Sequence, residues 1–76
     1  MFIVLQILEE RGGRISDNEL LLEIKRRGMD ISRSELNKIL MTLEVYGLIY
    51  VEPVSLKEKI IERIEEERRY LSVGED

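Results

Sequence analysis

Two copies of one six-residue pattern constrain the fold of this chain most strongly. Ile15–Leu20 reads I-S-D-N-E-L, and Ile31–Leu36 reads I-S-R-S-E-L. In each copy the serine suits the N-cap of a helix, because its hydroxyl oxygen can accept the backbone N–H three residues later. The glutamate can bond back to the N–H of the serine, and the flanking apolar residues suit the contact that accompanies such a capping box. The pattern therefore predicts helices that begin directly after Ser16 and Ser32.

Apolar spacing and glycines predict three helices in the first 47 residues. The first runs from about Phe2 to Arg11, the second from Asp17 to Arg27 and the third from Arg33 to Tyr46. A glycine follows each of them, and glycine readily adopts the left-handed backbone that ends a helix. The third helix carries apolar residues at the spacing i, i+3, i+4 and i+7, which is typical of a single buried stripe. These residues are Leu36, Ile39, Leu40 and Leu43.

The remaining chain predicts a short strand and a fourth helix. Leu48–Val51 is rich in β-prone residues, and we expect it to pair with a minimal strand at Arg14–Ile15. A third S-x-x-E pattern at Ser55–Glu58 follows Pro53 and predicts a helix from Leu56 to about Leu71. No Asn-Gly or similar turn separates this strand from a partner strand, so we expect any hairpin here to be truncated.

Composition excludes several classes of protein. The 76 residues include no cysteine and no histidine, which excludes disulfides, zinc–thiolate sites and the commonest general base. No apolar run approaches the ~20 residues of a membrane span. We therefore expect a cytoplasmic protein that is not an enzyme and has no cofactor, metal site or membrane partner. The glutamate-rich and amide-poor balance is typical of thermophilic proteins.

The charge is distributed unevenly. The net charge is −4, yet residues 11–38 carry seven basic and five acidic side chains, whereas residues 52–76 carry five basic and eight acidic ones. The densest basic cluster is Lys25-Arg26-Arg27, at the end of the second predicted helix. Two interpretations remain open for this cluster: it clamps a phosphate, or it stabilises the negative end of the helix dipole.

The end of the third predicted helix carries a family resemblance. Leu43–Ile49 reads L-E-V-Y-G-L-I, which resembles the exit of winged helix-turn-helix DNA-binding domains, and Met29–Ile31 is the right length for the turn between the second and third helices. The resemblance implies a mainly α winged helix over residues 1–54 with a reduced wing, followed by a C-terminal dimerisation helix and tail over residues 55–76. Small archaeal regulators of this kind look similar.

The resemblance also implies a function. The helix over residues 32–46 would read the major groove of double-stranded DNA, either sequence-specifically or architecturally, in a transcriptional regulator. The face opposite the buried stripe, at about 100° per residue, independently collects polar side chains and a methionine that suit base edges, phosphates and a thymine methyl. An ordinary solvated helix face has the same composition. The candidate DNA contacts are Arg33, Ser34, Asn37, Lys38, Met41 and Thr42, together with Lys25, Arg26 and Arg27.

The first predicted helix is apolar on more than one side, because seven of the first eight residues are apolar. Pairing of the first and fourth helices across a two-fold axis would cover the excess and predicts a homodimer. The alternative is that the fourth helix folds back within its own subunit. An alternative function follows too: a protein–protein interaction module that docks a partner through the same two helices. The predicted dimer interface comprises Phe2, Leu5, Leu56, Ile60, Ile61, Ile64 and Leu71.

Overall fold

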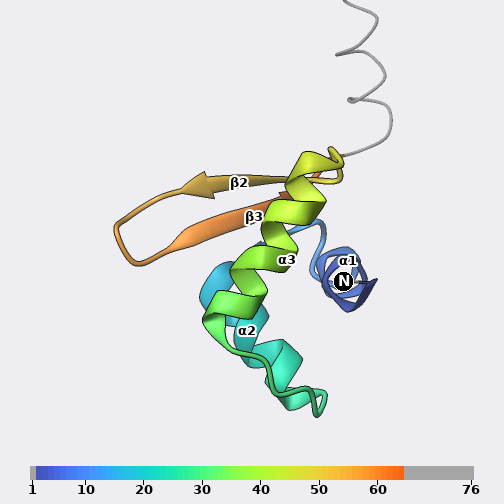
Figure 1. Ribbon diagram of the computed structural model, residues 1–76. Coiled ribbons are helices and arrows are strands. Elements are labelled where there is room, and N and C mark those ends of the chain that lie inside the picture. Colours follow the sequence, from blue (N-terminus) through green and yellow to red (C-terminus); the bar gives the residue numbers. More distant parts are fainter. Residues whose placement is uncertain (1, 65–76) are drawn as a thin grey trace, which may run out of the picture.

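The computed structural model describes residues 2–64, which form three helices and a three-stranded antiparallel sheet. Helices make up about half of this part of the chain, and the layout is consistent with a winged helix. Figure 1 shows the sheet along one side of the helices and the hairpin of its last two strands projecting beyond them. In chain order the elements are α1 (Phe2–Glu10), β1 (Arg14–Ser16), α2 (Asp17–Arg26), α3 (Arg33–Val45), β2 (Ile49–Pro53) and β3 (Lys59–Arg63).

The two predicted capping serines begin α2 and α3. The Ser16 hydroxyl accepts the backbone N–H of Glu19 at 3.2 Å. Ser32 forms the complete capping box: its hydroxyl accepts the N–H of Glu35 at 3.1 Å, and its own N–H donates to the Glu35 carboxylate at 2.9 Å. The starts of both helices are therefore confirmed, and the ends of all three helices lie one residue before the predicted ones.

A glycine turns the chain out of α3 and into β2. Gly47 has a φ of 75°, which only glycine adopts at no steric cost. Its N–H donates to the Glu44 carbonyl at 3.0 Å, and the N–H of Leu48 donates to the Leu43 carbonyl at 3.0 Å. These two bonds form a Schellman motif and satisfy carbonyls that would otherwise lack partners at the helix end.

The order of strands differs from the prediction. The sheet runs β1-β3-β2, and Ile61 of β3 lies between Ile15 of β1 and Val51 of β2. The predicted pairing of the first strand with the second is therefore wrong. β3 forms a hairpin with β2 and so occupies the central position, where both of its edges are paired.

The predicted fourth helix is wrong for residues 56–64, where the chain forms a turn and β3 instead. The Ser55 hydroxyl accepts the N–H of Lys57, only two residues later, at 3.2 Å. The N–H groups of Val54 and Ser55 both donate to the Glu58 carbonyl. The same serine chemistry that caps a helix thus stabilises a hairpin turn, as serine does in ST-turns.

Two further predictions about this segment, its truncated hairpin and the domain boundary, differ from the structure. The two strands of the hairpin are five residues long, so the expected truncation is wrong, and the predicted domain boundary after residue 54 falls inside the hairpin turn. Residues 65–71 of the predicted helix, including Leu71 of the predicted dimer interface, lie outside the described residues.

The core lies between the helices and one face of the sheet. Ile61 is fully buried there, so its assignment to a dimer interface is wrong. Because side chains alternate along a strand, Ile61 points toward the helices and Ile60 toward the opposite face of the sheet. No helix in the described part of the chain is long and apolar enough to cross a membrane. The core residues are Val4, Ile7, Leu8, Ile15, Leu20, Ile24, Leu36, Leu40, Leu43, Ile49 and Ile61.

Candidate nucleic-acid interface

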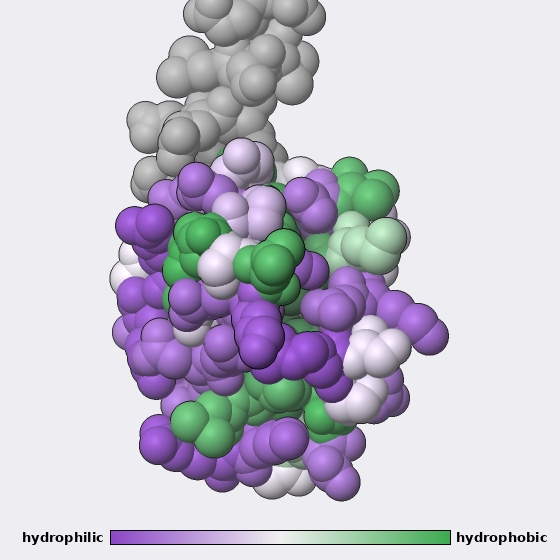
Figure 2. Space-filling model, turned by 90° about the vertical axis from the view of Figure 1, so that its left-hand side faces the viewer, coloured by the Kyte–Doolittle hydropathy of each residue, from purple (hydrophilic) through white to green (hydrophobic). Residues whose placement is uncertain are grey.

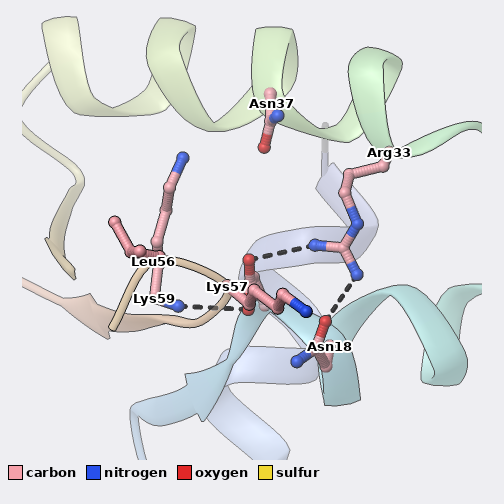
Figure 3. A pocket seen from close by; sticks show the side chains of 7 residues that line it. Asn18, Arg33, Asn37, Leu56, Lys57 and Lys59 are labelled. Atoms are coloured by element: carbon pink, nitrogen blue, oxygen red, sulfur yellow. Dashed lines mark hydrogen bonds and ion pairs between the residues drawn. The ribbon is translucent and has the colours of Figure 1, made fainter. Parts of the chain in front are cut away.

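The first half of α3, the start of α2 and the hairpin form the walls of a groove of about 540 Å³. Figure 3 shows this groove with α3 on one side and the hairpin on the other. Three of its seven lining residues carry positive charges, two are asparagines, and the single carboxylate is buried. The lining residues are Asp17, Asn18, Arg33, Asn37, Leu56, Lys57 and Lys59.

Asp17 joins three elements at the base of the groove. Its side chain is only 4% exposed. One carboxylate oxygen accepts from the Arg33 guanidinium at 3.1 Å, and the other accepts the backbone N–H of Lys59 at 3.2 Å. The second guanidinium branch of Arg33 donates to the Asn18 side chain. Arg33, a predicted DNA contact, therefore forms two bonds within the protein, and 47% of its side chain stays exposed.

Donors from both walls point into the groove. Figure 3 shows Asn37 reaching from α3 into the space, and the side chain of Lys59 extending from β3 toward α3. The amine of Lys57 lies near the side chain of Asn18, at the start of α2. The two lysines form no ion pair with a carboxylate among residues 2–64. The groove can therefore offer ammonium and amide donors to an anionic ligand.

The outward face of α3 adjoins the groove. Ser34, Lys38 and Met41 are exposed, as the helical spacing predicted. Thr42 is half-buried, and its hydroxyl donates to the Lys38 carbonyl at 3.0 Å. Most of the candidate contacts on α3 thus lie on one continuous surface, with Asn37 at its edge beside the hairpin.

The basic cluster at the end of α2 is placed differently. Arg27 pairs with Glu10 of α1 and, at 3.6 Å, with Glu23 of its own helix. The hydrogen bond to Glu10 is the main cause that raises the pKa of Arg27 above its ordinary value. Arg26 also pairs with Glu23, at 3.4 Å. Lys25 lies seven residues after Asn18, roughly 10 Å along the helix axis, at the end away from the groove.

The predicted dimer residues do not form one surface. Phe2, Leu5 and Ile64 line a second groove, of about 400 Å³, between α1 and the end of β3. Ile60 is half-buried on the outer face of the sheet, and Leu56 is fully exposed at the hairpin turn.

The face that carries the hairpin turn is mostly hydrophilic. Figure 2 shows hydrophobic side chains on this face in separate groups among purple ones. Exposed apolar residues on α3 and on the hairpin include Met41, Val45, Val54 and Leu56. Such a mixed surface suits a ligand with both charged and apolar parts better than a purely apolar partner.

Sequence reasoning did not assign five residues of the groove to this site: Asp17, Asn18, Lys57 and Lys59 were missed, and Leu56 was assigned to the dimer interface. The two lysines were assigned to a helix, although β-branched Ile60 and Ile61 next to them favour a strand. Asp17 and Asn18 carried no signal, because acidic and amide residues are common in the first turn of any helix.

Comparisons with known proteins identify no relative of this chain. No family model matches this chain, and searches of curated proteins and of solved structures find no match either.

Proposed function

We propose that this protein binds double-stranded DNA as a winged-helix regulator, with α3 in the major groove and the hairpin beside it. One observation carries the proposal: α3 and the hairpin direct Asn37, Lys57 and Lys59 into a single groove. Phosphate contacts in protein–DNA complexes come largely from lysine, arginine and amide side chains, and they fix the register of the protein on the duplex.

The ion pairs of the molecule support this location. The arginines of α2 and of the loop before β1 are paired with glutamates of α1 and α2: Arg11 with Glu23 at 3.2 Å, and Arg27 with Glu10. None of the four lysines forms such a pair in the described part of the chain, and three of them, Lys38, Lys57 and Lys59, lie in the groove or on the α3 face beside it. These pairs leave the net charge at −4, but they hold the arginines against carboxylates, whereas the lysines beside the groove stay available to bind an anion.

The outward face of α3 supplies chemistry for reading bases. Asn37 suits a bidentate contact with adenine, Lys38 suits guanine or a phosphate, and Met41 suits the methyl group of thymine. The order of the elements, with a helix–turn–helix followed by a hairpin, supports the winged-helix assignment.

A titration of duplex DNA at several salt concentrations tests the proposal. A dimer that touches ~6 phosphates has an expected slope of about −5 for log K against log salt. Lys57→Ala should weaken binding and flatten the slope by ~1 for each phosphate contact made. Lys25→Ala removes the same charge from a predicted contact at the far end of α2. Because Lys25 lies away from the groove, we expect it to leave the slope unchanged, which would reject Lys25 as a phosphate contact. Absence of any binding at ~50 mM salt and tens of micromolar protein would reject the proposal, since even non-specific binders reach about 10⁻⁴ to 10⁻⁶ M at physiological salt.

Base readout has its own test. Asn37→Ala should relax the base preference at a cost of about 1–3 kcal/mol on the preferred site. The salt slope should stay nearly constant, because the amide neutralises no phosphate. A uniform loss over all sequences would instead place Asn37 against the DNA backbone.

Protein docking is a second candidate function, and the groove beside α1 favours it. Phe2 is 82% exposed at the edge of that groove, where Leu5 and Ile64 supply further apolar surface. A homodimer through α1 also stays a prediction. Light scattering at micromolar concentration should give about twice the 9.0 kDa mass of the chain, and Phe2→Asp should return the mass to 9.0 kDa. A mass of 9.0 kDa for the parent protein would contradict the homodimer.

A further inference from the structure

Arg33 and Lys59 meet at Asp17, and this junction links the two walls of the groove. Arg33 belongs to α3, Lys59 to β3, and Asp17 to the start of α2. The two carboxylate oxygens are divided between the two walls: one accepts from the Arg33 side chain at 3.1 Å and the other from the Lys59 backbone at 3.2 Å. Figure 3 shows both bonds beneath the open space of the groove.

The pairing of β3 with β1 ends at Ser16 and Ile60, one residue short of Lys59. Ile61 is buried, but the residues from Glu52 to Lys57 are all exposed. The bond from Lys59 to Asp17 therefore holds β3 to the helices at the point where apolar contact with the core ends. A buried carboxylate in such a position is costly unless both of its oxygens are bonded, as they are here.

We propose that Asp17 is a positioning residue: by holding Arg33 and Lys59, it fixes the hairpin against α3 and sets the width of the groove. The functional part of this inference rests on the proposed DNA binding. Arg33 then acts on the hairpin through Asp17, while its side chain, 47% exposed, stays a predicted DNA contact. A groove held at a fixed width before binding avoids the cost of ordering the hairpin when the ligand arrives.

Asp17→Asn removes the charge and changes the hydrogen bonds of the side chain but keeps its size. Asparagine has nearly the same shape, but it offers one carbonyl oxygen to two donors and turns an N–H₂ group toward one of them. The connection that runs from the hairpin through residue 17 to α3 should therefore lose one of its two bonds. Glu19→Gln is the matched control, because it removes one negative charge from the same helical turn at an exposed position outside the groove.

The spacing of the walls can be measured directly in the full chain. The sequence contains no cysteine, so Met41→Cys and Val54→Cys place one spin label on α3 and one on the hairpin without competing sites. Pulsed electron spin resonance on this pair should give a narrow distance distribution in the parent protein, a broader one with Asp17→Asn and an unchanged one with Glu19→Gln. An unchanged distribution with Asp17→Asn would overturn the proposal. If Asp17→Asn does not fold, Arg33→Gln gives the same test, because it removes one of the two links and leaves the bond from Lys59.

The affinity for duplex DNA adds a readout that a loss of stability alone would not produce. Both Asp17→Asn and Glu19→Gln make the protein less negative, which by simple electrostatics strengthens DNA binding. We expect Asp17→Asn to weaken binding about tenfold, because the hairpin must be ordered on binding, while Glu19→Gln leaves binding equal or stronger. Equal strengthening by both variants would overturn the positioning role. A broadened distance distribution, together with no duplex binding by the unlabelled parent protein, would support the junction and reject only the proposed function.

Discussion

The two walls of the groove are held to the molecule in different ways. α3 is held by three buried leucines, Leu36, Leu40 and Leu43, along most of its length. The hairpin has Ile49 and Ile61 buried near its base, and beyond them its contacts with the helices are polar. One wall is thus fixed by apolar packing, which depends on side-chain volume, and the other partly by hydrogen bonds, which depend on the placement of single atoms.

Because of this difference, we expect substitutions in the apolar core to change stability and substitutions at the end of the hairpin to change the geometry of the groove. A change in the buried leucines or in Ile61 should lower the free energy of unfolding of the whole domain, because small domains unfold cooperatively. A change at the exposed end of the hairpin should alter the groove and leave stability nearly constant. The predictions below test this division, from the largest expected change in stability to the smallest.

Ile61→Ala should lower the free energy of unfolding by about 2–5 kcal/mol, the range for a large-to-small change in a packed core. Ile61 is completely buried in the central strand, and a shorter side chain leaves a cavity beside the helices. Urea denaturation measures the effect. Ile60→Ala is the control, because Ile60 is its half-buried neighbour on the opposite face of the same strand and should cost less. Equal losses for the two variants would contradict the register of β3.

Gly47→Val should cost about 1–2 kcal/mol or more, because a non-glycine residue in the left-handed region is strained and a β-branched one especially so. The φ of 75° at this position directs the chain from one wall of the groove to the other. Gly47→Asn is the control, since asparagine tolerates this conformation better. If the urea midpoints of the two variants coincide, the backbone at Gly47 is not in the left-handed region.

The helical part of the fold could be predicted from sequence because its signals are local. The capping serines, the glycines and the apolar spacing lie within a few residues of each element, and the ends of α1, α2 and α3 agree with prediction to one residue. The helical spacing within α3, which is also a local signal, correctly predicted that Ser34, Lys38 and Met41 are exposed.

The hairpin could not be predicted in the same way because its signals compete. Leu56, Ile60 and Ile64 repeat every four residues, which matches one helical face, while Ile61 alone marks the buried side of the strand. Pairing with β2 across the turn and with β1, which is far away in sequence, decides between the two. The groove was missed for the same reason, since Asp17 and Lys59 are 42 residues apart.

Ser32 and Ser55 begin the same local sequence pattern but have different structural roles. Both begin an S-x-x-E sequence, but Ser32 accepts the N–H three residues later and caps α3, whereas Ser55 accepts the N–H two residues later in the hairpin turn. Ser32→Ala should cost ~1 kcal/mol, since it removes a cap from the wall that apolar packing holds. Ser55→Ala should change stability by no more than ~0.5 kcal/mol, as expected for an exposed residue away from the core.

The two serine variants are controls for each other, because each deletes one exposed hydroxyl that accepts one backbone N–H. Urea denaturation gives the stability of both. Ser55→Ala should still loosen the hairpin turn, which exchange of the Lys57 amide hydrogen with solvent can detect even where the global stability is unchanged. A loss of ~1 kcal/mol with Ser55→Ala would show that the end of the hairpin is coupled to the core as firmly as α3 is. In that case the two walls of the groove would not differ in the way their contacts indicate.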